Sequence, residues 1–264
     1  MSSPLTVAVA QTAPRVGKVA ENLAAIEERI AGLAGRADLV VFPELFTTGY
    51  RRAGMDHGSL AEPVPGGPSL ERLAQAARGA RLAVAGTILE REGEQVYDTA
   101  ILVGPDGELV AKYRKTHLYP AELPYFSAGD RLVVAELTNG VAVGLTICFE
   151  HAFPEIFTAL ALRGAGLILI PSAVPRGYEY LLELRTRARA QDNQVFVASA
   201  NLVGFDGETQ WCGRSAIVDP RGTVLGAAGG DEEAEIVATI DPALIERERQ
   251  QEPALGHRRP ELYG

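Results

Sequence analysis

Three residues with reactive side chains follow closely on predicted strands, two of which are apolar. Glu44 follows the run DLVVFP, Lys115 follows LVAKYR, and Cys148 follows VAVGLTI. Such runs are typical of buried strands, and α/β sheets place their functional side chains beyond the carboxyl ends of strands. The three side chains could therefore share one crevice. A thiol, a carboxylate and an ammonium supply the nucleophile, base and cation that acyl transfer through a tetrahedral intermediate requires.

Each of these residues also has an ordinary structural explanation. An isolated cysteine is often a small buried hydrophobe, most lysines are surface charges, and a glutamate in a loop is usually solvated. Two local features count against that explanation. Cys148 precedes a Phe-Glu-His turn and a predicted helix, and a helix N-terminus favours the thiolate. The apolar neighbours of Glu44 indicate burial, which obliges a carboxylate to find a partner or take up a proton.

Other chemistries find little support in the sequence. The four histidines form no metal-spaced pair and there is no Cys-x-x-Cys, so no metal is expected. No phosphate-binding or dinucleotide-binding glycine motif follows a predicted strand, so no cofactor is expected either. A redox-sensing role for Cys148 would need a resolving cysteine nearby. The other cysteine, Cys212, belongs to a different segment and is predicted to be passive.

The composition narrows the choice of partners. The formal net charge is −9, from 34 acidic and 25 basic residues, and an acidic surface repels nucleic acid. No apolar run approaches the roughly 20 residues that cross a bilayer, and no basic residue precedes the first apolar run, so neither a membrane partner nor a signal peptide is expected. Two cysteines among 264 residues fit a reducing cytoplasm.

Apolar strands alternate with amphipathic helices in the first and third quarters of the chain, and hairpins fill the rest. This alternation predicts a single α/β domain over residues 1–264, with layered sheets covered by helices and a polar tail at 250–264. The buried stripe of the last predicted helix is expected at Leu181, Leu184 and Ala188. Strands are predicted at 5–10, 38–42, 82–89, 141–147, 167–170, 195–200 and 236–240, hairpins at 96–113 and 215–225, and helices at 19–33, 70–80, 153–163 and 178–193.

The segments that carry the three reactive residues resemble a known family, the nitrilase superfamily of carbon–nitrogen hydrolases. The matching runs are FPELFTTGY at 42–50, YRKTHL at 113–118 and GLTICFE at 144–150. Further matches are RARAQDN at 187–193 and RRPELY at 258–263. The resemblance extends from Val7 to the C-terminus, and each of the three main motifs holds one reactive residue.

The resemblance implies a fold and a set of catalytic roles. The family has a four-layer α-β-β-α sandwich, usually forms dimers through a helical face, and uses no cofactor. Its Glu-Lys-Cys triad maps onto Glu44, Lys115 and Cys148. Glu122 matches a second glutamate that often assists, although an exposed loop carboxylate is the alternative for this position. The tail at 250–264 would be an arm that packs on a partner subunit.

The mechanism implied by the resemblance begins with attack of the Cys148 sulfur on an amide carbon. A free thiol has a pKa of about 8.5, so Glu44 must take its proton or a cation must hold the thiolate. Lys115 and the backbone N–H of Phe149 would stabilise the oxyanion. Ammonia then leaves a thioester, which water activated by Glu44 hydrolyses.

The resemblance favours an amidase acting on small aliphatic or ω-amino amides, as a homodimer or larger homo-oligomer. The run from Phe149 to His151 is closer to nitrilases, so nitrile hydrolysis and N-carbamoyl amino acid hydrolysis stay open as alternatives. A non-enzymatic alternative is an inactive member of the fold that binds or assembles. The candidate pocket residues, each of which could equally be core, are Tyr50, Tyr119, Phe126, Phe149, Ser172, Ala173 and Trp211.

Overall fold

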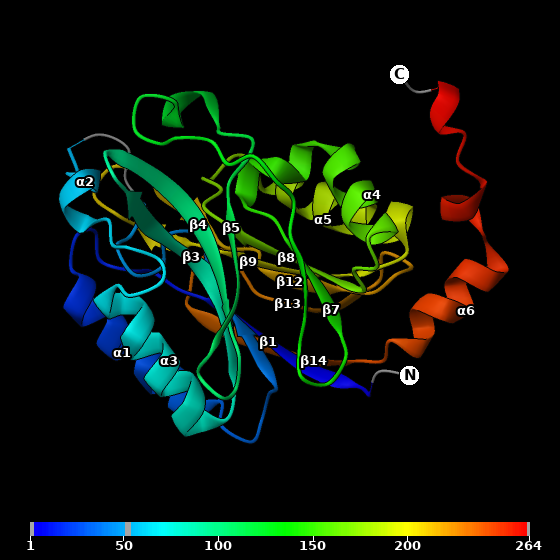
Figure 1. The fold of residues 1–264 in the computed structure, drawn as a ribbon, viewed down its shortest axis with the longest axis horizontal. Helices are drawn as coiled ribbons and strands as arrows, with labels where there is room; N and C mark the ends of the chain where they lie inside the picture. Colours follow the sequence, from blue (N-terminus) through cyan, green and yellow to red (C-terminus); the bar gives the residue numbers. More distant parts are fainter. Residues whose placement is uncertain (1–2, 51–53, 263–264) are drawn as a thin grey trace.

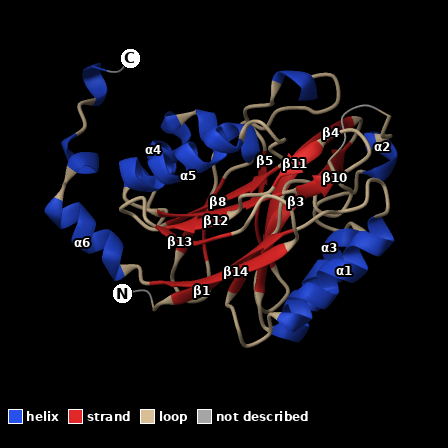
Figure 2. Ribbon diagram, turned by 180° about the vertical axis from the view of Figure 1, so that it is seen from behind, coloured by secondary structure: helices blue, strands red, loops and turns tan. Residues whose placement is uncertain are grey.

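The structure is a computed structural model that describes residues 3–50 and 54–262. Two six-stranded sheets pack face to face, and pairs of helices cover their outer faces (Figure 1). Seen from behind, the strands again lie between the two helical layers (Figure 2). The predicted four-layer α-β-β-α sandwich is therefore confirmed.

The first sheet brings the segments of Glu44 and Lys115 to the same edge. Its strand order is β14-β1-β2-β3-β4-β5. Strands β1, β2 and β3 are parallel, β4 reverses, and β5 again runs in the direction of β3. The carboxyl ends of β2 and β5 therefore point the same way. The strands are β1 (Leu5–Gln11), β2 (Leu39–Val41), β3 (Ala83–Glu92), β4 (Gln95–Val103), β5 (Leu109–Arg114) and β14 (Ala234–Ile240).

The second sheet has the order β13-β12-β9-β8-β7-β6, and β7, β8 and β9 are parallel. Cys148 follows β7 at the carboxyl edge of these parallel strands. A separate ribbon pairs β10 (Val203–Phe205) with β11 (Gln210–Cys212). The strands of the second sheet are β6 (Val134–Glu136), β7 (Ala142–Leu145), β8 (Leu167–Ser172), β9 (Phe196–Asn201), β12 (Ala216–Val218) and β13 (Val224–Ala227).

Strand periodicity explains the layering. Along β1, Val7 and Val9 enter the core between the sheets, while Ala8 and Ala10 lie in the core under the helices of the first sheet. This is the period of two that a strand buried on both faces requires. The helices are α1 (Val19–Gly32) and α3 (Pro68–Ala80) over the first sheet, α4 (Pro154–Leu162) and α5 (Glu179–Asn193) over the second, and the peripheral α2 (His57–Leu60) and α6 (Ala243–Gln251).

The buried face of α5 was predicted wrongly. Leu184 is 65% exposed, and the inner face is formed instead by Leu182, Thr186 and the residues one turn further on. Polar residues can lie on this face because they find partners there. The side chain of Asn193, for example, pairs with Thr158 of α4 and accepts its hydroxyl hydrogen bond at 2.8 Å.

The C-terminal segment lies at the side of the sandwich (Figure 1). Helix α6 continues to Gln251, so the predicted arm at 250–264 begins inside a helix. Gln194 holds this helix by donating to the carbonyls of Glu248 and Glu252. The last two residues of the predicted arm lie outside the described residues. Among those that are described, no helix is both long and apolar enough to cross a membrane.

Candidate active site

Glu44 lies in a sharp turn after β2 that directs its side chain inward. Leu45 has a φ of 48°, and its N–H donates to Thr87 Oγ1 at 2.8 Å. The Glu44 side chain is fully buried. Burial raises the pKa of Glu44, an effect that the charge of Lys115 opposes. A carboxylate held in this way is a better proton acceptor than a solvated one.

Lys115 is the cation at the centre of the site. Its backbone N–H donates to the carbonyl of Asp98 at 2.9 Å, so this hydrogen bond to β4 fixes the position of its backbone. Its Nζ lies 2.6 Å from Oε1 of Glu44 and 2.8 Å from Oε1 of Glu122. Burial alone would lower the pKa of Lys115, but the neighbouring negative charges outweigh burial and hold it well above its usual value. Lys115 is therefore an ammonium.

Glu122 is buried, so the alternative of an exposed loop carboxylate is wrong. It ends the short 3-10 turn Pro120–Glu122. Its Oε2 accepts the backbone N–H of Tyr119 at 2.7 Å, and its Oε1 accepts the hydroxyl of Tyr50 at 2.5 Å as well as the Lys115 ammonium. These donors anchor the carboxylate beside the lysine.

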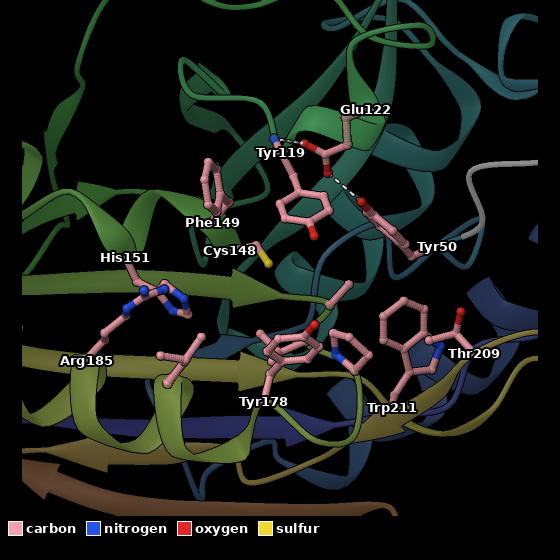
Figure 3. A pocket seen from close by; sticks show the side chains of 14 residues that line it. Tyr50, Tyr119, Glu122, Cys148, Phe149, His151, Tyr178, Arg185, Thr209 and Trp211 are labelled. Atoms are coloured by element: carbon pink, nitrogen blue, oxygen red, sulfur yellow. Dashed lines mark hydrogen bonds between the residues drawn. The ribbon is translucent and has the colours of Figure 1, made fainter.

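Cys148 begins the 3-10 turn Cys148–Ala152 with a φ of 42°, a conformation that costs energy for a residue other than glycine. The turn aims its sulfur into a cavity (Figure 3). Burial and the charge of Glu44 raise the pKa of the thiol well above its usual range, while Lys115 and a hydrogen bond from the backbone of Ala173 oppose the rise. The resting group is a thiol that needs a base.

Glu150 was not among the predicted site residues, although it ties two active-site segments together. Its Oε1 accepts hydrogen bonds from the N–H and hydroxyl of Thr116 at 2.8 and 2.7 Å, and from the hydroxyl of Tyr113. Its Oε2 accepts the N–H of Ile147 at 2.8 Å. One carboxylate thus bridges Thr116, the neighbour of Lys115, and Ile147, the neighbour of Cys148. Its place two residues after the cysteine was the only signal in the sequence.

The cavity above Cys148 has a volume of about 330 Å³. Of the predicted pocket residues, five line it: Tyr50, Tyr119, Phe149, Ala173 and Trp211. Glu122 also reaches its wall. The structure adds lining residues that the sequence analysis missed, namely His151, Val174, Pro175, Tyr178, Leu181, Arg185 and Thr209.

Two predicted pocket residues lie elsewhere. Ser172 is fully buried at the end of β8, and its hydroxyl donates to the carbonyl of Ile170. Its own carbonyl accepts the N–H of Glu44 at 3.4 Å, so it supports the site through its backbone. Phe126 packs in an apolar cluster with Leu45 and Tyr50 behind the cavity wall.

Arg185 and His151 give one end of the cavity a polar character, opposite Trp211 and Thr209 (Figure 3). Burial and the charge of Arg185 lower the pKa of His151 to about 3, so its ring is neutral. Within the part of the chain that the structure describes, Nδ1 of His151 has no hydrogen-bond partner. Both residues escaped prediction because a helix position alone does not reveal which side chains face a cavity.

The acidic cluster of Glu44, Asp98 and Glu122 has the composition of a metal site. The Lys115 ammonium lies within 4 Å of all three carboxyl groups and already supplies a positive charge at this place. A metal ion would have to displace or oppose that charge. The residues present therefore suit an internal ammonium better than a bound cation.

Relatives of known sequence match nearly the whole chain. A Pseudomonas protegens protein described as "Hydrolase in pqqF 5′ region" is 39% identical over 98% of this chain and 90% of its own length. An (R)-stereoselective amidase of a Pseudomonas species is 37% identical, over 98% of this chain and 93% of that protein.

Solved structures and the family model agree with these relatives. An amidase mutant from Nesterenkonia sp. AN1, with the acetamide moiety of fluoroacetamide added covalently at its active-site cysteine, has a TM-score of 0.86. It is 30% identical, and the match covers 99% of this chain and 96% of that one. The model of the family described as carbon-nitrogen hydrolase matches residues 6–250. The chain therefore belongs to the carbon-nitrogen hydrolases of the nitrilase superfamily.

Proposed function

We propose that this chain is an amidase that hydrolyses small aliphatic amides to a carboxylic acid and ammonia, with Cys148 as nucleophile. The observation that carries the proposal is the convergence of Cys148, Glu44 and Lys115 beside one small cavity. The charges of Glu44 and Lys115 both act on the sulfur, and Lys115 contacts Glu44 directly. The amidases among its relatives support the same chemistry.

The first half-reaction forms a thioester. Glu44 takes the thiol proton while the Cys148 sulfur attacks the amide carbon. The Lys115 ammonium and the N–H of Phe149 stabilise the oxyanion, and one such donor typically contributes about 3 kcal/mol at the transition state. As the C–N bond breaks, Glu44 returns the proton to the leaving nitrogen and ammonia departs.

The second half-reaction releases the acid. Glu44 removes a proton from a water molecule, whose oxygen attacks the thioester carbon. The same two donors stabilise the second oxyanion. The C–S bond then breaks and the Cys148 thiolate takes up the proton from Glu44, which restores the starting state. In this scheme Glu122 and Tyr50 orient Lys115 and the base.

The cavity favours a small acyl group without a positive charge. Its wall is largely aromatic and aliphatic, and its lining includes Phe149, Tyr119 and Trp211. The Arg185 guanidinium at its far end would repel the ammonium of an ω-amino amide. Arg185 also supports a second candidate, an N-carbamoyl amino acid hydrolase, because it could pair with the substrate carboxylate.

Ammonia release from matched panels of amides, N-carbamoyl amino acids and nitriles tests the proposal. We expect the aliphatic amides to be hydrolysed fastest, with no release by the Cys148→Ala variant. Cys212→Ala is the matched control, since Cys212 is buried in a different segment. Activity retained without the Cys148 thiol, or release from nitriles alone, would contradict the proposal. No release from any panel by the folded protein would favour the inactive binding alternative.

We also propose that the chain forms a homodimer and acts in the cytoplasm. The outer face of α4 and α5 exposes Leu162, Tyr180 and Leu184, each by more than half. Exposed apolar side chains on a helical face are typical of a subunit interface. Light scattering after size-exclusion chromatography should show a dimer that Leu184→Asp weakens. A monomer at all concentrations would contradict this part. The two free cysteines fit a reducing compartment.

A further inference from the structure

Asp98 is a buried carboxyl group that the proposed mechanism does not use. It lies on β4, and its side chain is fully buried. In residues 3–50 and 54–262, no donor reaches either of its carboxyl oxygens, and the same is true of Oε2 of Glu44. Buried carboxyl oxygens without a donor are costly, so three of them on two neighbouring groups indicate a retained proton.

The two carboxyl groups face each other. Oxygens of Glu44, Asp98 and Glu122 lie within 4.8 Å of one another, and Asp98 is within hydrogen-bonding reach of Glu44. Lys115 Nζ lies 3.8 Å from Oδ2 of Asp98, much further than from the other two carboxylates. The ammonium therefore gives its hydrogen bonds to Glu44 and Glu122, and not to Asp98.

The net charge of the buried carboxyl groups and Lys115 also favours a retained proton. Three ionised carboxylates around one ammonium would leave two uncompensated negative charges in a region without solvent. Both oxygens of Glu122 already have donors, since together they accept three hydrogen bonds. Burial and the charge of Glu44 raise the pKa of Asp98 well above its usual value. The charged groups that act on Asp98 are Glu44 after β2, Lys115 after β5 and Glu122 of the 3-10 turn.

We propose that Asp98 is a positioning residue that stays protonated and donates its O–H to Oε2 of Glu44. Lys115 holds one oxygen of Glu44, and Asp98 would hold the other, so the carboxylate cannot rotate away from the thiol of Cys148. A neutral donor also favours the ionised form of Glu44, which is the form that acts as a base. This inference rests on the proposed role of Glu44.

Two substitutions test whether Asp98 acts as a hydrogen-bond donor or as a negative charge. Asp98→Asn keeps a donor of the same shape, whereas Asp98→Ala removes it. We expect Asn to lower kcat/KM by less than about fivefold and Ala to lower it by about 10- to 100-fold, mainly in kcat. Ala should also move the acid limb of the pH profile to higher pH, because Glu44 loses a stabilising donor. Equal losses in the two variants, or an unmoved acid limb in Ala, would overturn the proposal.

An infrared measurement gives a readout that requires neither catalytic activity nor the Asp98→Ala variant. Cys148→Ala protein at neutral pH should show the C=O band of a buried protonated carboxyl group, and the double variant Cys148→Ala, Asp98→Asn should lack it. A missing band, or one that persists in the double variant, would overturn the assignment of the proton to Asp98. If the wild-type enzyme hydrolysed no amide, the proposed function would fail while this measurement still decided the protonation of Asp98.

Discussion

Glu44 and Cys148 are both held by burial in forms suited to passing a proton between them. The raised pKa of the thiol keeps the proton on sulfur until a base removes it, and the raised pKa of Glu44 makes this carboxylate a competent base. Lys115 stabilises either anion, since it acts on both groups. The site therefore needs no permanently ionised thiolate.

Replacing Glu44 by Gln should remove the base and leave the shape of the site. We expect kcat to fall by about 10²- to 10⁴-fold, together with the alkylation rate of Cys148 by iodoacetamide. In the wild-type enzyme, activity should fall with decreasing pH as Glu44 becomes protonated. Because the pKa of Glu44 is raised, this acid limb should lie above the value of an ordinary glutamate.

Stopped-flow alkylation and steady-state kinetics across pH measure these effects. Glu136→Gln, at an exposed position on β6, is the matched control and should behave like the wild type. If Glu44→Gln kept its alkylation rate, Glu44 would not be the base for the thiol.

At the scale of elements, the sequence predicted most strands and helices because their apolar periodicities are strong. The runs that became β1, β2 and β8 are mainly apolar, and the three reactive residues lay at strand ends as expected. Short or polar elements were missed. Strand β6 and the ribbon of β10 and β11 have three residues per strand, too few for a pattern, and their pairing depends on distant partners.

Some residues of the candidate site were missed for the same reason, dependence on distant partners. Glu150 contacts Thr116, which lies 34 residues away in sequence, and Asp98 lies beside Glu44 of a distant segment. The sequence around Glu150 and Asp98 does not indicate these distant contacts. Arg185 lies on the helix whose buried face was predicted wrongly, so its orientation toward the cavity could not be deduced.

Glu150→Gln tests the link between the two active-site segments. Both oxygens of Glu150 accept backbone N–H groups, so an amide must turn its NH₂ toward one of these donors. We expect a loss of about 2–4 kcal/mol in unfolding free energy and a lower kcat. Chemical denaturation and kinetics measure both. Glu155→Gln, exposed at the start of α4, is the control, and equal stability of the two variants would contradict the link.

At the scale of the whole molecule, both sheets contribute to one inner core, with Val9 and Leu39 from the first and Val143 and Leu169 from the second. The carboxylate and ammonium of the candidate site follow strands of the first sheet, and the thiol follows a strand of the second. The geometry of the site thus depends on how the sheets pack. That residues 1–264 form a single domain stays a prediction, and the shared core favours it.

The packing of α5 over the second sheet brings Arg185 to the end of the cavity opposite Trp211. We therefore expect the cavity to discriminate between substrates by their charge. Within the described residues the guanidinium has no carboxylate partner, so it can act on a substrate.

Among amides of equal chain length, we expect kcat/KM to be lowest for the one with an ω-ammonium group. Arg185→Gln should raise its kcat/KM about tenfold relative to the neutral amide. Arg187→Gln on the same helix is the control, since Arg187 donates to Gly222 away from the cavity. An unchanged ratio in Arg185→Gln would mean that Arg185 does not select charge, and the aromatic wall alone would then define the substrate.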